Sequence, residues 1–341
     1  MERDKQLDVY RALSMIYIVC VIHYVYWLDV GCEPIRSALL FEMPVIFFIA
    51  GASQSLKKDT GNISFIRMFT DRAKRLLIPY YIYLPILYIW LAAMTFLIPE
   101  NGCTAADIHN ITTKDIIKTL LTGGSTNIPY YGYTWFISCY LIISVSLPIQ
   151  KRIISVVSKH TYIILAACIM LTLSFIKLPI AENEIKNIPL YNFFYIAGYL
   201  YYRNYSIKAL YIVTAITSGI CIICFHEGIM IPMQDHKFPA DFYFLIFGTA
   251  CLGIIGICLR KIDLPYTKVL NIWNTKGYTI YLYQNISLYM TMAIAWPILQ
   301  DIENSTIKST SAILIIFIAN TLLSYPAFYM EKRIKSMVNV K

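Results

Sequence analysis

Long apolar stretches alternate with short polar connections along the whole chain. About 20 apolar residues are enough for one helix to cross a bilayer. Lipid offers no hydrogen-bond partners to the backbone, so such a stretch is expected to be helical. The pattern predicts ten spans, at residues 9–28, 39–56, 78–98, 133–148, 162–178, 188–201, 207–225, 242–259, 278–299 and 312–328. We therefore expect an all-α, polytopic integral membrane protein, with residues 1–341 forming a single transmembrane domain surrounded by membrane lipids.

The composition excludes an ordinary soluble domain. Hydrophobic residues make up 58% of the chain, charged residues 14%, and the mean hydropathy is +0.58. Soluble domains carry about 25% charged residues. The first apolar stretch is longer than the core of a secretion signal and has no small-residue cleavage site, so we expect it to be retained as a helix.

The distribution of lysine and arginine predicts the topology. With the N-terminus inside, 22 of the 29 basic residues fall in inner segments. This asymmetry is the usual mark of cytoplasmic loops, and it predicts that both termini are cytoplasmic. The net charge of +9 is explained by topology, so no nucleic-acid partner is expected.

Two features of the predicted outer side leave alternatives open. The longest loop, residues 99–132, is either a lid over a site or a plain surface loop. Cys32 and Cys103 both fall in outer loops, where a disulfide could form in an oxidising compartment. Cys221 and Cys224 lie in an apolar span without a second cysteine pair, so we expect no metal site.

Ionisable side chains inside spans are costly and therefore mark candidate functional sites. Arg11 and His23 lie in the first span, and Glu42 lies at the outer start of the second. Twelve residues of helix place His23 about 18 Å beyond Arg11 along the axis. The alternatives are a snorkelling anchor for Arg11, a packing role for His23 and a favourable helix N-terminal charge for Glu42.

A second basic group precedes the third span. Arg72 and Arg75 are three residues apart and would share a helix face. Paired guanidinium groups bind phosphates well. The alternative is that these residues serve only the inside-positive topology.

Six short motifs occur in order along the chain: LDVYRA (7–12), FEMPVIFFIAG (41–51), RAKRLLIP (72–79), WF (135–136), FYIAGYL (194–200) and GYTIYLYQ (277–284). Together they resemble the acyltransferase 3 family, which comprises membrane-bound O-acyltransferases of bacterial surface glycans and of some lipids or antibiotics. The resemblance implies a location in the bacterial inner (plasma) membrane. It also implies an acyl-CoA donor, which we expect to be acetyl-CoA, and a hydroxyl acceptor on a glycan or lipid-linked sugar.

The same resemblance implies roles for the candidate residues. Arg11, Arg72 and Arg75 would bind the donor phosphates. His23 would act as general base on the acceptor hydroxyl, and we infer that Glu42 orients it. The chain has no G-x-S-x-G motif, so a serine nucleophile is not supported.

The chain departs from the family pattern at several positions. The family usually has ten residues between the arginine and the histidine of the first helix, and this chain has eleven. At about 100° per residue, the longer spacing would turn the two side chains about 120° apart instead of about 20°. We therefore predict a π-bulge within residues 17–21. The family often has histidine in place of Glu42 and Gln284, and serine in place of Ala50.

Two other functional classes are alternatives to an enzyme. A transporter or a flippase of lipid-linked glycans could also use intramembrane histidine and arginine. The absence of an internal repeat argues against it. A non-enzymatic scaffold would give no reason for His23.

Overall fold

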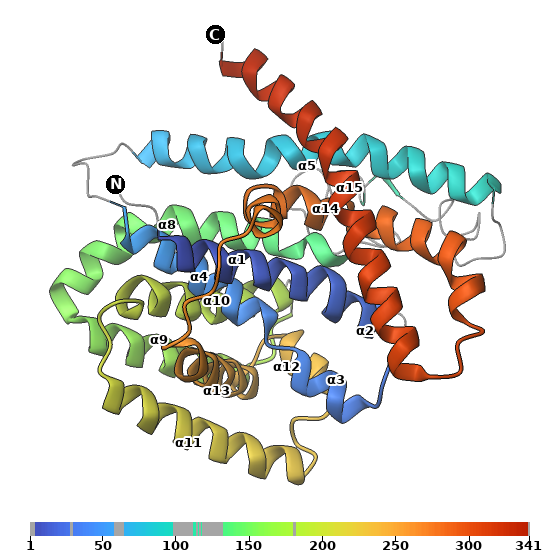
Figure 1. Ribbon diagram of the computed structural model, residues 1–341. Coiled ribbons are helices and arrows are strands. Elements are labelled where there is room, and N and C mark those ends of the chain that lie inside the picture. The colour runs from blue at the N-terminus through green and yellow to red at the C-terminus, as the bar shows by residue number, and fades with distance from the viewer. Residues whose placement is uncertain are drawn as a thin grey trace. The chain divides into compact units, whose positions relative to one another are not determined.

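The computed structural model describes residues 4–27, 30–57, 65–97, 112, 113, 115, 117, 132–179 and 182–339 (Figure 1). Its main elements are α1 (Lys5–Ile16), η1 (Tyr17–Ile22), α2 (His23–Trp27), α3 (Glu33–Leu39), α4 (Glu42–Ser55), α5 (Phe65–Leu97), η2 (Gly132–Trp135), α8 (Phe136–Val157), α9 (Lys159–Ser174), α10 (Glu182–Tyr201), α11 (Ile207–His226), α12 (Met233–Lys237), α13 (Phe242–Leu259), α14 (Lys268–Leu299) and α15 (Ser305–Asn339). Every regular element in these ranges is a helix, which confirms the all-α prediction for the described residues.

Each of the ten predicted spans overlaps a helix. Six helical stretches in the described residues are long and apolar enough to cross a membrane: Lys5–Tyr26, Glu33–Ser55, Phe136–Val157, Ile207–His226, Phe242–Leu259 and Ser305–Met337. The shorter helix Lys159–Ser174 is also apolar. The count of ten crossings and the cytoplasmic termini stay predictions.

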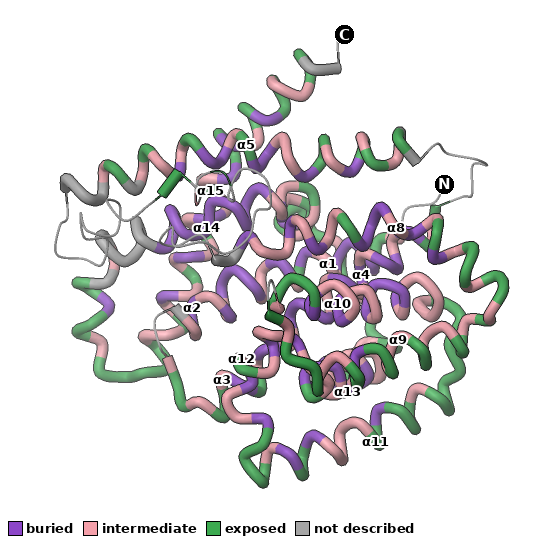
Figure 2. Tube along the Cα trace, turned by 180° about the vertical axis from the view of Figure 1, so that it is seen from behind, coloured by how far each residue is buried: buried purple, intermediate pink, exposed green. Residues whose placement is uncertain are grey.

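Helix α11 shows most directly that the protein lies in a membrane. Its mean hydropathy is 2.0, yet only 17% of its most apolar stretch is buried inside the protein. Figure 2 shows the helix as largely exposed. Soluble proteins rarely expose an apolar surface that runs along a whole helix of 20 residues. Lipid is the solvent that suits such a helix.

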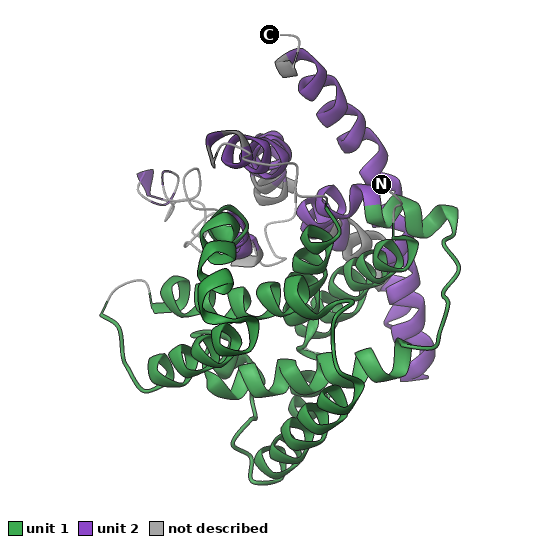
Figure 3. Cartoon of the chain, turned by 90° about the vertical axis from the view of Figure 1, so that its left-hand side faces the viewer, with its two compact units in different colours: residues 1–63, 142–274 green, residues 64–141, 275–341 purple. Residues whose placement is uncertain are grey.

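The chain divides into two compact units (Figure 3). Unit 1 comprises Met1–Ile63 and Ile142–Asn274, and unit 2 comprises Ser64–Leu141 and Thr275–Lys341. Both units are discontinuous in sequence. The single domain over residues 1–341 stays a prediction.

Glycines allow a very close helix contact in unit 1. Helices α4 and α10 approach so closely that a Cβ atom on Gly51 would lie 1.7 Å from the carbonyl oxygen of Tyr195. A Cβ on Gly198 would lie 1.9 Å from the carbonyl oxygen of Phe48. Small residues are the usual means of close helix packing in membranes. The two motifs that contain these glycines therefore meet at a helix crossing.

Contacts at the helix ends of unit 1 join segments that are distant in sequence. At one end, Arg203 pairs with Asp4 at 2.6 Å, and Gln6 donates to the carbonyl oxygen of Leu264 at 3.1 Å. At the other, the N–H of Met233 donates to Ser37 Oγ at 2.9 Å.

Asp4 is a titratable group at the first of these ends. Burial would raise the pKa of Asp4, but its bonds to the Leu7 N–H, Arg203 and Tyr202 outweigh burial and lower it. The carboxylate therefore stays ionised while it holds Arg203.

In unit 2, the motif GYTIYLYQ packs against α5, α8 and α15. The hydroxyl of Tyr278 donates to the carbonyl oxygen of Leu76 at 3.0 Å, and that of Thr279 to Glu331 at 2.8 Å. The Tyr281 ring stacks edge-on against Phe136, with centroids 5.0 Å apart. Gln284 is buried. These contacts explain why the motif is rich in hydroxyl and aromatic side chains.

Candidate functional site

The first long helix contains the predicted distortion. Residues Tyr17–Ile22 form a π-helix, and the N–H of His23 donates to the carbonyl oxygen of Ile18, five residues earlier. The predicted π-bulge is therefore confirmed. A π-turn accommodates one more residue than an α-turn. The twelve-residue step from Arg11 to His23 thus turns like an eleven-residue step, so it carries both to one helix face.

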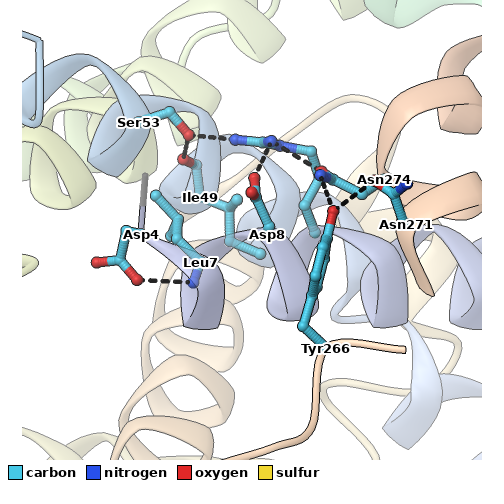
Figure 4. A network of polar contacts seen from close by, with 9 residues as sticks. Asp4, Leu7, Asp8, Ile49, Ser53, Tyr266, Asn271 and Asn274 are labelled. Atoms are coloured by element: carbon cyan, nitrogen blue, oxygen red, sulfur yellow. Dashed lines mark hydrogen bonds and ion pairs between the residues drawn. The ribbon is translucent and has the colours of Figure 1, made fainter. Parts of the chain in front are cut away.

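Arg11 is held by three side chains of unit 1. Its Nη1 donates to Asp8 Oδ1 at 3.1 Å and to Asn274 Oδ1 at 2.9 Å, and its Nη2 donates to Ser53 Oγ. Figure 4 shows this network, in which Ser53 in turn donates to the carbonyl oxygen of Ile49.

Asn274 is itself held by Tyr266, which lies just before α14, and through it by Asn271 at the start of α14. Its amide donates to the hydroxyl of Tyr266 at 3.3 Å, and that hydroxyl donates to Asn271 Oδ1 at 2.7 Å (Figure 4). The Arg11 side chain is therefore oriented from α1, from α4 and from the start of α14. Such pre-orientation lowers the entropic cost of binding an anion.

Glu42 lies at the start of α4 and is paired with a residue far away in sequence. Lys237 of α12 donates a hydrogen bond to its Oε1, while Oε2 is buried without a hydrogen-bond partner. Glu42 and Lys237 are 3% and 6% exposed. The expectation that Glu42 orients His23 stays a proposal.

His236 fastens the segment that carries Lys237. Its Nδ1 lies 2.6 Å from Asp241 Oδ2, and its Nε2 lies 2.6 Å from the carbonyl oxygen of Ile229. Burial disfavours the charged ring, but the bonds to Asp241 and Ile229 and the charge of Asp235 outweigh burial and raise the pKa of His236. Both neighbours are acceptors, so the geometry suits an imidazolium that donates twice.

Arg72 and Arg75 lie in the first half of α5, in unit 2, and differ in their surroundings. Arg72 is 9% exposed, whereas Arg75 is exposed. Arg75 lines an open pocket of about 270 Å³ together with Asp71, Lys74, Ile78 and Lys335. Three cations and one carboxylate make this pocket attractive to an anion. Arg72 is not among its lining residues.

The sequence-predicted residues are thus distributed over both units. Arg11, His23 and Glu42 belong to unit 1, and Arg72 and Arg75 belong to unit 2. In the described residues, no group of three or more His, Cys, Asp or Glu side chains could hold a metal ion. Cys32 is an exposed free thiol, whereas Cys103 and most of the loop 99–132 lie outside the described residues.

Lys237, Asn274 and Lys335 could not be identified as candidate site residues from the sequence. Lys237 lies between two predicted spans as one of several basic residues, and its partner Glu42 is 195 positions away. No spacing rule joins residues so distant in sequence. The signals that remained were an acidic residue at the start of an apolar span and a lysine next to a histidine.

Comparison with known proteins identifies the family. The family model for an acyltransferase domain, the acyltransferase 3 model, matches residues 4–329. No curated protein and no solved structure matches the chain significantly. The match spans nearly the whole sequence, including the motifs around Arg11, Glu42 and Arg75. The chain therefore belongs to the acyltransferase 3 family.

Proposed function

We propose that this acyltransferase moves an acetyl group from acetyl-CoA to a hydroxyl of an extracytoplasmic or lipid-linked glycan, in the inner (plasma) membrane of a bacterium. The family supports acyl transfer in general. The strongest support for the proposal is the π-helix Tyr17–Ile22. It compensates the unusual spacing of Arg11 and His23 and so restores their common face.

In the proposed reaction His23 is the general base. Its imidazole removes the proton from the acceptor hydroxyl while the hydroxyl oxygen attacks the thioester carbon. The new C–O bond forms as the C–S bond breaks, and the CoA thiolate then takes the proton from the imidazolium. An imidazole suits this exchange because its ordinary pKa is near neutral. Glu42 is proposed to orient the ring and to stabilise its charged form.

The basic residues supply the proposed contacts with the donor. Arg11, Arg72 and Arg75 are proposed to bind the CoA phosphates. The pocket beside Arg75 supports this role because Lys74 and Lys335 add charge to it. Because Arg72 is buried, we propose that it also helps to position α5, in addition to supplying positive charge.

Calorimetry of acetyl-CoA binding to the purified protein in detergent tests the donor. We expect saturable binding by the wild type and strong weakening in Arg72→Ala/Arg75→Ala. The matched control is Arg260→Ala/Lys261→Ala, which removes the same charge from two exposed residues of another connection. Absence of binding by a folded wild-type protein would contradict the proposal and favour a transporter.

A further inference from the structure

The pair Glu42–Lys237 joins two distant parts of unit 1. Glu42 opens α4, whereas Lys237 ends α12 in the connection from α11 to α13. Lys237 Nζ donates to Glu42 Oε1, and both side chains are almost completely buried. A buried charge is tolerated only when a partner compensates it. Each of these two residues therefore depends on the other for its charge.

The segment that delivers Lys237 is held at several points. We refer to residues 229–241 as the α12 segment. The N–H of Met233 donates to Ser37 Oγ at 2.9 Å, which fastens the segment to α3. His236 bridges its two ends through Ile229 and Asp241. The position of Lys237 is therefore fixed by the hydrogen bonds that hold the backbone of the α12 segment.

The other oxygen of Glu42 is differently placed. Oε2 is buried and has no hydrogen-bond partner. The nearby hydroxyl of Tyr17 already donates to the carbonyl oxygen of Leu39 at 2.6 Å. Buried polar atoms without partners are rare and call for an explanation.

A side chain that shares a helix face with His23 lies near Glu42. Tyr26 lies three residues after His23 on α2, so the two share a face. Tyr26 is within electrostatic range of Glu42. Catalytic hydrogen bonds are often long before substrate binds and tighten in the reacting complex.

We propose that Lys237 is a positioning residue: it keeps Glu42 ionised and occupies Oε1, so that Oε2 is reserved for His23. This inference rests on the proposed function, in which Glu42 orients His23. Lys237 itself touches no reacting atom. Its effect on the reaction passes through Glu42.

Infrared spectroscopy of the purified protein tests the charge state without any need for activity. The variants are Lys237→Met, Lys237→Arg and Glu42→Gln/Lys237→Met. We expect Lys237→Met to show a protonated-carboxyl C=O band that is absent from wild type, from Lys237→Arg and from the double variant. If Lys237→Met does not fold, the double variant should fold, because it no longer buries an uncompensated carboxylate.

Kinetics test the positioning role. Acetyl transfer is measured in membranes of expressing cells at varied acetyl-CoA concentration. We expect kcat of Lys237→Met to fall about 10- to 100-fold. The KM for acetyl-CoA should stay within about twofold, because the lost contact is not a donor contact. Lys237→Arg should restore most of kcat, since it restores the positive charge.

Three results would overturn the inference. The first is a folded Lys237→Met variant without the carboxyl band. The second is a double variant that fails to fold, which would give Lys237 a packing role unrelated to Glu42. The third is a Lys237→Met variant with unchanged kcat. If wild type itself transfers no acetyl group, the proposed function fails, while the infrared comparison still decides whether Lys237 sets the charge of Glu42.

Discussion

The backbone N–H of His23 donates to the carbonyl oxygen of Ile18, five residues earlier, and this bond closes the π-helix that precedes His23. The extra residue resets the phase of the helix between Arg11 and His23. A rare backbone form thus occurs where the spacing of two candidate functional residues requires it. π-bulges are frequent at functional sites.

Removing the extra residue should therefore be tolerated better than adding another. Deletion of Val21, which is only partly buried, shortens the step to the eleven residues that suit a regular α-helix. We expect the deletion variant to keep measurable acetyl transfer. Insertion of an alanine after Val21 should abolish it, because the two side chains then turn apart. Equal loss in both folded variants would contradict the role of the bulge.

Replacement of His23 tests the proposed base. We expect His23→Ala to lower acetyl transfer by about 10²- to 10⁴-fold, the usual contribution of a general base. Glu42→Gln should lose less, because the amide keeps the size of the side chain. Transfer is measured with labelled acetyl-CoA at equal protein levels. A fully active His23→Ala would refute the assignment.

The crossing of α4 and α10 should not accept a methyl group. In Gly51→Ala the Cβ would lie 1.7 Å from the Tyr195 carbonyl oxygen, so the helices must separate. We expect a loss of about 3 kcal/mol or more, seen as a lower melting temperature in detergent. Gly219→Ala in α11 is the matched control. Its Cβ meets nothing within 4 Å, so its melting temperature should be unchanged or slightly higher.

The two arginines of α5 should differ when they are replaced singly. Arg75→Ala removes a cation from the open pocket, so it should weaken acetyl-CoA binding and leave the melting temperature nearly unchanged. Arg72→Ala removes a buried side chain and should lower the melting temperature as well. Calorimetry and thermal melting of the same samples separate the two effects. Identical behaviour of both variants would contradict this division.

Stability should depend on pH at both ends of unit 1, with opposite signs. The pKa of His236 is raised above 6.5 in the folded protein, so its contribution is complete below pH 6.5 and is lost as the pH rises through the folded value. The pKa of Asp4 is lowered from 3.8, so its contribution is present above 3.8 and is lost as the pH falls through the folded value.

Melting temperatures in detergent across these pH ranges provide the measurement. His236→Gln should remove the loss on the alkaline side, and Asp4→Asn should remove the loss on the acidic side. Each variant serves as the control for the other. A decline on the alkaline side that persists in His236→Gln would assign it to another group.

Local patterns were enough to predict the helices and the distortion in the first of them. Apolar stretches predict helices because the bilayer forbids unpaired backbone. The relative phase of Arg11 and His23 follows from the number of residues between them, the pitch of a helix and the spacing that is usual in the family. The π-helix ends at Ile22, within one residue of the predicted range 17–21.

Contacts between distant segments could not be obtained in this way. Nothing in the sequence indicates that Gly51 and Gly198 contact the same helix crossing. Their common role is seen only in the structure, where α4 and α10 cross. Glu42 is paired with Lys237 because the α12 segment folds back onto α3, and neither residue carries a periodic signal of that path. Likewise, Arg72 and Arg75 are equivalent in spacing but differ in burial, because burial depends on what packs against α5. Periodicity follows from the geometry of a single helix, whereas pairing and burial follow from how the helices pack against one another.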